Sequence, residues 1–283
     1  MRTLPSLMLV WLLGQAASPA ADDWRSAPAG EWRALFDGRS LEGWVVKLHR
    51  HELGDNYADT FRVENGAIRV MYDRYDQGFG DRFGHLFYKE PFSHYVLSLE
   101  YRFFGEQEEG GPSYAKLNSG VMFHSQAPDT ILKDQDWPIS VEAQFLAGGR
   151  TTMNVCTPGT EICMGGEMVK AHCTNSTSRP YGDDQWVRVE LEVLGGERVR
   201  HWIGGEVVLE YERPSIGGGV ANRYDPAVKR DGTVLERGYL ALQAESQPVE
   251  FRRIRLLNLS GCQDRSSPAF RPYFVHRDDA RCR

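Results

Sequence analysis

Apolar and polar side chains alternate with a period of two along several short segments of this 283-residue chain. The clearest are residues 93–103, which read SHYVLSLEYRF, and residues 187–193, which read VRVELEV. Residues 207–211 and 251–257 continue the pattern. Such alternation is typical of strands that bury one face in an antiparallel sheet. No stretch of twelve residues has a clean helical period, so the pattern predicts strands and little helix.

Turn residues separate these segments at short intervals. Asn65-Gly66 lies between residues 61–63 and 67–70, and an Asn-Gly pair between two apolar runs predicts a tight hairpin. The sequence contains no Pro- or Ser-rich linker that divides it and no internal repeat. Single β-sandwich domains often reach about 200–250 residues. The sequence therefore predicts an all-β fold, an antiparallel β-sandwich formed by one domain.

The first 20 residues have the composition of a secretory signal peptide. Arg2 precedes an apolar run over residues 7–13, and small residues end the segment at Ser18-Pro19-Ala20. The apolar run is too short for a permanent membrane span, although a membrane-tethered N-terminus is the alternative interpretation. Nothing later in the sequence approaches the length of a span. We expect cleavage near Ala20, a single mature domain over residues 21–283, and a secreted, periplasmic or cell-surface location.

The charge balance excludes one class of partner. The chain has 33 Lys and Arg residues against 39 Asp and Glu residues, which gives a formal net charge of −6. Because no excess of positive charge is left for a phosphate backbone, we expect no nucleic-acid partner. A hydrophobic fraction of 41% with 25% charged residues is ordinary for a globular protein. These numbers do not determine the oligomeric state.

Five cysteines follow the predicted signal peptide, so an exported chain is expected to form disulfides and to leave at least one thiol over. Gly165-Gly166 predicts a hairpin turn that sets Cys156 opposite Cys173, with Pro158-Gly159 absorbing any offset as a bulge. We therefore expect a Cys156–Cys173 disulfide, with Cys163 near the turn.

The two remaining cysteines, Cys262 and Cys282, are expected to close a tail over residues 261–283. A zinc site is the rival interpretation of the cysteines. The sequence has no CxxC pair, however, and the other spacings do not fit a structural zinc site.

Seven segments together resemble one family of carbohydrate-active proteins. They are, in chain order, LFDGRSLEGW (35–44), TFRVENGAIRV (60–70), NSGVMFHSQ (118–126), VEAQFL (141–146), QWVRVELEV (185–193), RHWIGGEVVLEYERP (200–214) and GYLALQAESQPVEFRRIRLLNL (238–259). Each is weak alone, but the ordered set covers nearly all of the mature chain, with a core over about residues 34–260. The set resembles the 3-keto-disaccharide hydrolases, also described as 3-keto-glucoside 1,2-lyases and 3-keto-2-hydroxyglucal hydratases.

The resemblance implies an exported sandwich of the concanavalin A-like, glucanase-like (jelly-roll) type that cleaves 3-keto-glycosides. A ketone at C3 acidifies the proton at C2, so a modest base can remove that proton and the anomeric substituent can leave by β-elimination. Water then adds to the product, and the net reaction is hydrolysis. This chemistry needs a base, an acid and an electrophile at the ketone oxygen. A divalent cation is one group that could serve as the electrophile; the sequence identifies no metal ligands and no other cofactor.

One predicted strand carries the candidate base. Glu142 and Gln144 alternate with the apolar residues Val141, Ala143 and Phe145. If the apolar set faces the core, the polar pair lies on the opposite face, which in a curved sandwich can bind a ligand. A carboxylate and an amide both hydrogen-bond sugar hydroxyls directionally. Glu142 is therefore the candidate base and Gln144 a candidate substrate-binding residue; a solvated strand face is the alternative.

Two further predicted strands carry the other candidates. In NSGVMFHSQ, His124 falls on the polar face and is the candidate proton donor, because imidazole titrates near neutral pH. Asn118, at the entry to this strand, is either a turn residue or a hydroxyl ligand. In GYLALQAES, Gln243 and Glu245 share a face, so that Glu245 could flank a sugar together with Glu142. We expect all these residues to meet in one pocket; a structural histidine and unrelated surface carboxylates are the alternatives.

Two other functions compete with the enzyme. The same polar and aromatic face would serve a non-catalytic, lectin-like carbohydrate-binding module, which has no titrating group essential to turnover. A structural sandwich that binds another exported protein would have a contiguous exposed apolar patch and no convergent polar pocket. Two smaller features are also open. The aromatic segment 74–88 could stack on a sugar or cover a sheet edge, and Arg188, Glu190 and Glu192 suggest a charge row on an outer face.

Overall fold

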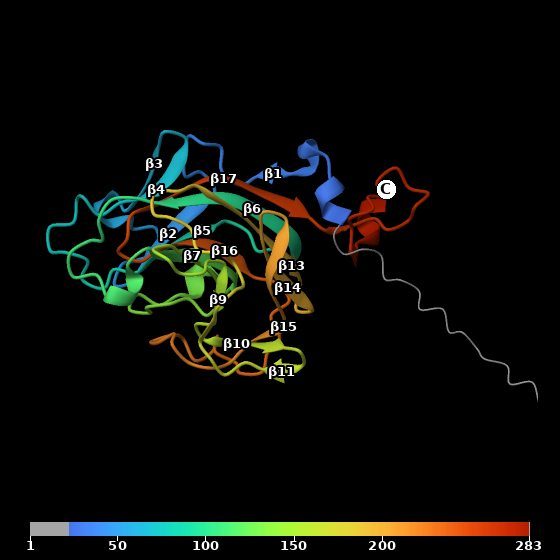
Figure 1. Cartoon of the computed structure of the whole chain (residues 1–283). Coiled ribbons are helices and arrows are strands. Elements are labelled where there is room, and N and C mark those ends of the chain that lie inside the picture. Colours follow the sequence, from blue (N-terminus) through green and yellow to red (C-terminus); the bar gives the residue numbers. More distant parts are fainter. Residues whose placement is uncertain (1–22, 283) are drawn as a thin grey trace, which may run out of the picture.

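The computed structural model describes residues 23–282, and the predicted signal peptide lies outside this range. Two antiparallel sheets lie face to face (Figure 1). The larger, ten-stranded sheet has the order β11-β10-β15-β14-β13-β6-β17-β4-β3, with β1 beside β17. Its strands are β1 Arg33–Ala34, β3 Phe61–Glu64, β4 Ala67–Val70, β6 His94–Phe103, β10 Thr160–Met164, β11 Glu167–Met168, β13 Val187–Leu194, β14 Arg198–Ile203, β15 Glu206–Ile216 and β17 Val249–Asn258.

The second, seven-stranded sheet has the order β12-β9-β8-β7-β16-β5-β2. Consecutive strands such as β6 and β7 lie in different sheets, so each sheet combines segments that are distant in the sequence. Its strands are β2 Trp44–Leu48, β5 Gly84–Tyr88, β7 Asn118–Ser125, β8 Val141–Leu146, β9 Asn154–Cys156, β12 Cys173–Thr174 and β16 Tyr239–Ala244.

All helices in residues 23–282 are short 3₁₀ turns: η1 Asp23–Ser26, η2 Ala29–Glu31, η3 Tyr57–Asp59, η4 Ser113–Ala115, η5 Pro128–Thr130 and η6 Asp279–Cys282. None of them has the length and apolar character that a membrane crossing requires. The predicted all-β, antiparallel sandwich with little helix is therefore confirmed.

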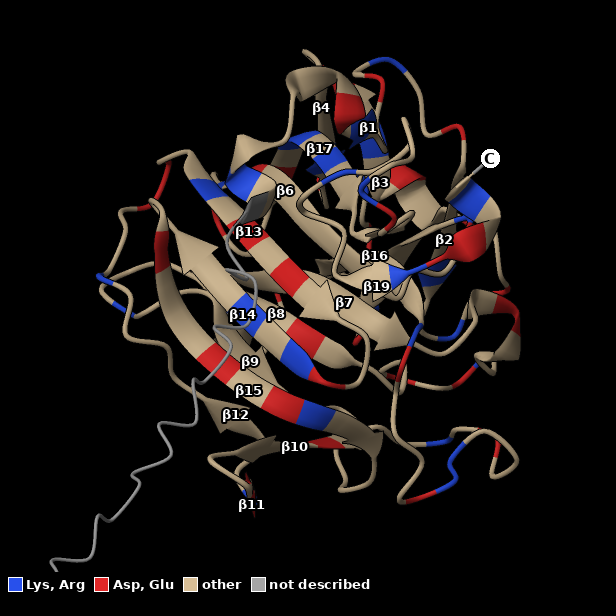
Figure 2. Ribbon diagram, turned by 90° about the vertical axis from the view of Figure 1, so that its right-hand side faces the viewer, with Lys and Arg blue, Asp and Glu red and all other residues tan. Residues whose placement is uncertain are grey.

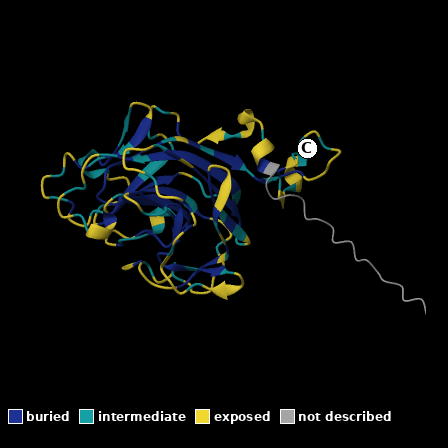
Figure 3. Ribbon diagram, in the orientation of Figure 1, coloured by how far each residue is buried: buried dark blue, intermediate teal, exposed yellow. Residues whose placement is uncertain are grey.

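The core lies between the two sheets, where the strands are buried and the loops at the ends are exposed (Figure 3). Phe123, Val141 and Phe145 of the seven-stranded sheet face Leu97 and Tyr101 of the ten-stranded sheet within one hydrophobic cluster. The rings of Tyr101 and Phe145 stack with their centroids 4.2 Å apart. The alternation in the sequence thus identified the inward-facing side of these strands correctly.

The outer face of the ten-stranded sheet carries the predicted charge row. Arg188 on β13 lies opposite Glu100 on β6, and Glu192 lies opposite Arg200 on β14. The Nε atom of Arg188 is also 2.8 Å from an oxygen of Glu190. Figure 2 shows acidic and basic positions recurring along β13, β14 and β15. Opposite charges on neighbouring strands pair across this face, although the acidic residues Glu100, Glu190 and Glu192 are buried.

The chain forms both predicted disulfides, Cys156–Cys173 and Cys262–Cys282, and Cys163 is a free, buried thiol. Gly165-Gly166 is a turn between β10 and β11, as predicted. The arms of this turn nevertheless diverge, because β10 pairs with β15 in one sheet whereas Cys156 and Cys173 pair through β9 and β12 in the other.

The C-terminal disulfide closes a small appendage to the sandwich. It joins Cys262 to Cys282, and the two-stranded sheet of β18 (Ser260–Gly261) and β19 (His276–Arg277) lies within the same tail. A cross-link of this separation stabilises a short tail that has little core of its own.

Candidate active site

The seven-stranded sheet places a row of polar side chains on its outer face. Residues directly opposite each other on paired strands point to the same face. Register pairs His85 on β5 with Gln243 on β16, and Gly120 on β7 with Gln144 on β8. Glu142 lies in the next row, opposite Met122. The alternation that buries Val141 and its neighbours therefore turns this polar set away from the core.

A cavity of about 450 Å³ opens over this row. Its volume lies within the roughly 300–1,000 Å³ that is usual for small-ligand sites. Four of the six residues predicted to be catalytic or substrate-binding line it, namely Asn118, Glu142, Gln144 and Glu245. The other lining residues are Tyr114, Trp137, Arg150, Cys156, Pro158, His172, Cys173 and Val220.

Glu142 is held over a glycine of the neighbouring strand. Its side chain is only 6% exposed, and a Cβ atom added to Gly120 would lie 2.6 Å from its Oε1 atom. The missing side chain at Gly120 thus makes room for the carboxyl group itself. Burial raises the pKa of Glu142 to about 8, while a hydrogen bond with the Gln243 side chain acts in the opposite direction. Gln243 does not line the cavity but contacts it through this carboxyl group.

Glu245 is the second buried carboxyl group of the cavity. It is 3% exposed and follows directly after β16. Burial raises its pKa well above the usual value, the charge of Glu142 raises it further, and the charge of Arg150 lowers it. Because the charge of one carboxylate opposes ionisation of the other, the pair ionises in two separate steps, and the first step leaves one carboxylate beside one protonated carboxyl group.

Arg150 provides a cation at the same wall. Its Nε atom donates to the carbonyl oxygen of Ala147 at 3.1 Å, and one terminal nitrogen donates to the carbonyl oxygens of Leu117, at 3.0 Å, and Lys116. These backbone acceptors fix the guanidinium group at the cavity. Sequence reasoning missed Arg150 because it lies in the loop after β8, beyond the alternating pattern. The adjacent Gly148-Gly149 pair was the one available signal that the chain turns back toward the sheet.

Several polar atoms around this cavity are buried without a hydrogen-bond partner in the described part of the chain. They are Oδ1 of Asn118, Oε1 of Glu142, Oε1 of Gln243, Oε2 of Glu245 and Nε2 of the neighbouring His85. Folded proteins leave few such groups unsatisfied, and each costs about 1–3 kcal/mol. Their concentration at one place fits a ligand rich in hydroxyl groups.

The structure does not bring His124 into this cavity, which corrects the expectation that it meets Glu142. Between Met122 and Ser125, β7 has one residue more than the paired segment of β16, and His124 has a φ of 47°. This bulge breaks the alternation. The ring turns toward the ten-stranded sheet, where Nε2–H donates to the carbonyl oxygen of Gly195 at 3.0 Å. His124 is 1% exposed and burial lowers its pKa to about 4, so it is a structural histidine.

Two residues with aromatic rings near the cavity, Trp137 and His85, were not among the site residues predicted from the sequence. Trp137 lies in the loop between β7 and β8, and its ring centroid is 5.6 Å from that of His85. Burial lowers the pKa of His85 to about 3, with a smaller effect from the charge of Lys47, so this imidazole is neutral.

Within the aromatic segment 74–88, Phe79 and Phe83 are buried in the core. That part of the segment packs against the sheet and does not stack on a ligand.

A cluster of sulfur and nitrogen atoms also borders the cavity. One ligand atom each from Cys156, His172 and Cys173 lie within 4.8 Å of one another. Because the two sulfur atoms form a disulfide, they are not thiolates and this cluster does not suit a metal ion. The carboxylate and amide oxygens could ligate a hard cation. Arg150, however, already places a fixed positive charge beside Glu245, which opposes a second cation there.

Comparison with known protein families identifies the family of the chain. The family described as "3-keto-alpha-glucoside-1,2-lyase-like domain" matches residues 31–257. The chain belongs to this family. The matched range includes both buried carboxyl groups and Arg150 and excludes the C-terminal disulfide, so the candidate site lies inside the part of the chain that is typical of the 3-keto-α-glucoside-1,2-lyase-like domains.

Solved structures similar to the chain include a proposed glycosyl hydrolase from Parabacteroides distasonis, with 18% identity and a TM-score of 0.48, covering 82% of this chain and 98% of that one. Carbohydrate-binding module CBM66 from Bacillus subtilis has 10% identity and a TM-score of 0.45, covering 76% and 96% of the two chains. Among curated proteins there is no match.

Proposed function

We propose that this protein is an exported enzyme that cleaves 3-keto-glycosides by elimination followed by hydration. The observation that carries the proposal is the pair of buried carboxyl groups, Glu142 and Glu245, beside Arg150 in one sugar-sized cavity. Membership of the 3-keto-α-glucoside-1,2-lyase-like family supports the substrate class. The two disulfides and the signal-like N-terminal sequence support export.

In the first step, the Glu142 carboxylate removes the proton from C2 of the sugar. The C2–H electron pair forms an enolate with the C3 ketone, and the cationic Arg150 stabilises the negative charge on the ketone oxygen. The electrons then return to form the C1=C2 double bond and expel the anomeric oxygen, which takes a proton from the Glu245 carboxyl group. This assigns the electrophile, the base and the acid to residues of the chain.

In the second step, water adds across the C1=C2 bond. The carboxylate of Glu245 accepts a proton from the water as its oxygen bonds to C1, and Glu142 returns its proton to C2. Both carboxyl groups end in their starting states, and the sum of the two steps is hydrolysis. The raised pKa of Glu142, about 8, makes its carboxylate a stronger base than an exposed one, and the fraction of molecules that carry this carboxylate rises as the pH increases toward 8.

The amide side chains hold the sugar in this scheme. Asn118 and Gln144 face hydroxyl groups around the ring, and Gln243 holds the Glu142 carboxyl group by a hydrogen bond. Oδ1 of Asn118 has no hydrogen-bond partner in the part of the chain that the structure describes and can accept from the sugar. Trp137 supplies an apolar surface at the wall of the cavity.

The direct test is to incubate the mature protein with a 3-keto-disaccharide and with the corresponding unoxidised disaccharide. We expect release of sugar, and the unsaturated keto-sugar as intermediate, from the first compound alone, because only a C3 ketone acidifies the C2 proton. Equal cleavage of both compounds would disprove elimination. Binding of the 3-keto compound without any cleavage would instead establish the lectin-like module.

The lectin-like function is the second candidate, and the unpaired polar atoms around the cavity favour it equally, since they suit binding as well as catalysis. A purely structural sandwich fits less well, because it predicts no convergent polar pocket. The strongly raised pKa values of two adjacent carboxyl groups favour the enzyme, since binding alone does not require them.

A further inference from the structure

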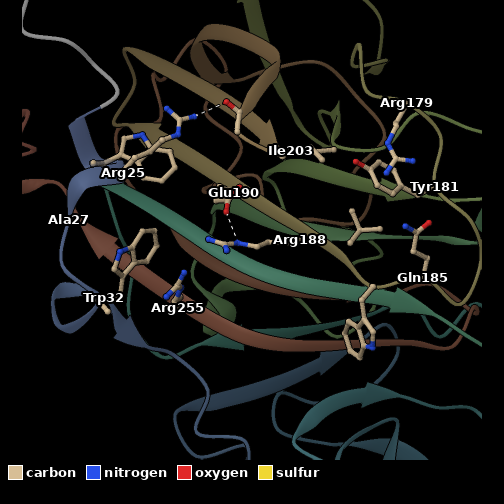
Figure 4. Close-up of a pocket in the computed structure, with 16 residues that line it drawn as sticks. Arg25, Ala27, Trp32, Arg179, Tyr181, Gln185, Arg188, Glu190, Ile203 and Arg255 are labelled. Carbon is tan, nitrogen blue, oxygen red and sulfur yellow. Dashed lines mark hydrogen bonds and ion pairs between the residues drawn. The ribbon is translucent and has the colours of Figure 1, made fainter.

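A second, larger cleft of about 690 Å³ lies on the opposite side of the sandwich, over the outer face of the ten-stranded sheet. Figure 4 shows side chains converging on it from the N-terminal segment 24–32, from the loop before β13 and from β17. Its lining is unlike that of the first cavity, because arginine and aromatic side chains dominate. Among them are Arg25, Arg179, Arg255, Trp24, Trp32 and Tyr181.

The cleft has an uncompensated positive charge. Glu190 is the one acidic residue of its lining, and it forms an ion pair with Arg188 at 2.8 Å. Among the side chains of residues 24–282, no carboxylate lies within ion-pair distance of Arg25, Arg179 or Arg255. Three cationic groups therefore remain on a chain whose formal net charge is −6. Burial lowers the pKa of Arg255 most, and the charges of Arg188 and Arg253 lower it further, while the charges of Glu190 and Glu100 act in the opposite direction.

Aromatic rings hold the three guanidinium groups in place. The Cζ atom of Arg179 is 4.1 Å from the ring centroid of Tyr181, and that of Arg255 is 4.7 Å from Trp32. Arg25 lies 3.9 Å above the ring of Trp202 and donates to the carbonyl oxygen of Gly205 at 3.1 Å. Stacking engages the planes of the guanidinium groups and leaves their N–H edges available for an anion.

Hydrogen-bond donors in the cleft are unused. The side chains of Arg179 and Arg255 make no hydrogen bond to any other residue of the described range. The Nε1 atom of Trp24, a buried residue of the lining, also has no partner there. A buried indole N–H normally finds an acceptor. These donors point to a ligand that supplies acceptor oxygens.

We propose that this cleft binds an anionic glycan, whose carboxylate or sulfate groups contact the guanidinium groups and whose sugar rings lie on the aromatic side chains. Arginine forks match the planar oxygens of a carboxylate and the oxygens of a sulfate. Aromatic planes beside those forks suit the apolar face of a pyranose ring, which an acidic peptide lacks. The binding site is separate from the catalytic cavity, and the proposal does not depend on the reaction catalysed there.

The test measures binding of the intact mature protein, by calorimetry, to four probes: an oligogalacturonate, a heparin-derived oligosaccharide, a neutral cello-oligosaccharide of equal length, and poly-glutamate. We expect at least one acidic glycan to bind about tenfold or more tightly than the neutral one. Preference for the uronate or for the sulfated probe distinguishes the two anions. Failure of both acidic glycans to bind would overturn the proposal.

Variants locate the site. The double variant Arg179→Ala/Arg255→Ala should lose about tenfold or more in affinity for the acidic glycan. The control Arg39→Ala/Arg265→Ala removes the same charge from exposed positions outside the cleft and should change affinity by less than about twofold. Equal losses in the two double variants would mean that net charge alone is responsible, and would reject the cleft.

A second variant separates a glycan from any acidic polymer. Trp32→Leu keeps apolar bulk but removes the aromatic plane and the stacking partner of Arg255, so it should weaken binding of both ligands, and the loss should be severalfold greater for the glycan than for poly-glutamate. Poly-glutamate binding as tightly as the glycans, together with equal losses for both ligands in Trp32→Leu, would show that the cleft takes an acidic peptide instead. The lysine variant Arg179→Lys/Arg255→Lys, which keeps the charge and the fold but not the fork, should retain only part of the affinity.

Discussion

Two glutamates on the outer faces of the sandwich have pKa shifts of opposite sign. Glu142 lies on the seven-stranded sheet, where burial raises its pKa to about 8. Glu100 lies on the ten-stranded sheet, where burial acts in the same direction. Hydrogen bonds with Arg252, at 2.7 Å, and Arg253, at 2.9 Å, and the charges of both residues outweigh it and lower the pKa. Glu142 therefore binds a proton readily, whereas Glu100 stays ionised to lower pH.

The opposite pKa shifts of Glu142 and Glu100 arise from the strands beside them and not from the strands that carry them. VEAQFL, which contains Glu142, and SHYVLSLEYRF, which contains Glu100, both alternate apolar with polar residues, and each alone predicts a half-solvated strand. Glu142 is flanked by Gly120 and by the half-cystine Cys156, and neither supplies a cation or a strong donor. Glu100 has arginines on β17 instead. A carboxyl group becomes reactive where the fold buries it and withholds its counter-charge.

We expect the largest effect from Glu142→Gln, which tests the difference between Glu142 and Glu100 directly. Glu142→Gln keeps the shape of the side chain but removes the base, so turnover of a 3-keto-glycoside should fall by about 100-fold or more while binding of a substrate analogue changes little. The matched change on the other face, Glu100→Gln, should leave turnover unchanged. Steady-state kinetics and analogue binding give both quantities. Full activity of Glu142→Gln would remove this residue from the mechanism, and equal losses of binding and turnover would favour the lectin-like function.

We expect a smaller effect on turnover from Gly120→Ala, which changes the packing around Glu142. In Gly120→Ala the new Cβ would lie 2.6 Å from Oε1 of Glu142 and 2.9 Å from the carbonyl oxygen of Ala143. The carboxyl group must move, so turnover should fall by about tenfold, and overpacking should lower the free energy of unfolding by about 1–3 kcal/mol. Gly30, beside the second cleft, has no atom within 4 Å of an added Cβ, and Gly30→Ala is the control. Equal effects of the two changes on turnover would contradict the close fit at Gly120.

The pH dependence of stability should also differ between the faces. The folded-state pKa of Glu142 is raised above its unfolded value of about 4.5, so the folded state binds more protons between these values. The free energy of unfolding should therefore be highest below about pH 4.5 for this group and fall as pH rises toward 8, by at most about 1.4 kcal/mol per pH unit. In Glu142→Gln the decline should be smaller by this contribution, while the contribution of Glu245, whose pKa burial also raises, remains; denaturant unfolding across the range measures the difference.

Glu100 should behave in the opposite way. Its pKa is lowered in the folded state, so its contribution to stability is present above the unfolded pKa and is lost as pH falls through the folded one. Glu100→Gln should therefore destabilise the protein near neutral pH and have less effect in acid. Parallel stability curves for wild type and both variants would show that neither carboxyl group titrates differently on folding.

The sequence predicted more of the fold than of the site, for a physical reason. Alternation reports which side of a strand faces the core, and it placed Glu142, Gln144 and Gln243 on the outer face correctly. It says nothing about residues in loops, so Arg150 was missed. It also assumes an unbroken strand, and the bulge at His124 violates that assumption because one extra residue inverts the face.

We expect the smallest effect on turnover from a substitution of His124, which tests whether this histidine is structural. His124→Phe keeps a ring of similar size in the core but removes the hydrogen bond from Nε2–H to the carbonyl oxygen of Gly195. An unpaired buried carbonyl should lower the free energy of unfolding by about 1–3 kcal/mol. Turnover should change by less than about twofold, because His124 lies between the sheets and does not line the cavity. A fall in turnover of about 100-fold in a variant that is still folded would restore His124 as the proton donor. It would also mean that the reacting sugar approaches the edge of the sandwich near Gly195 and not the polar face of the seven-stranded sheet.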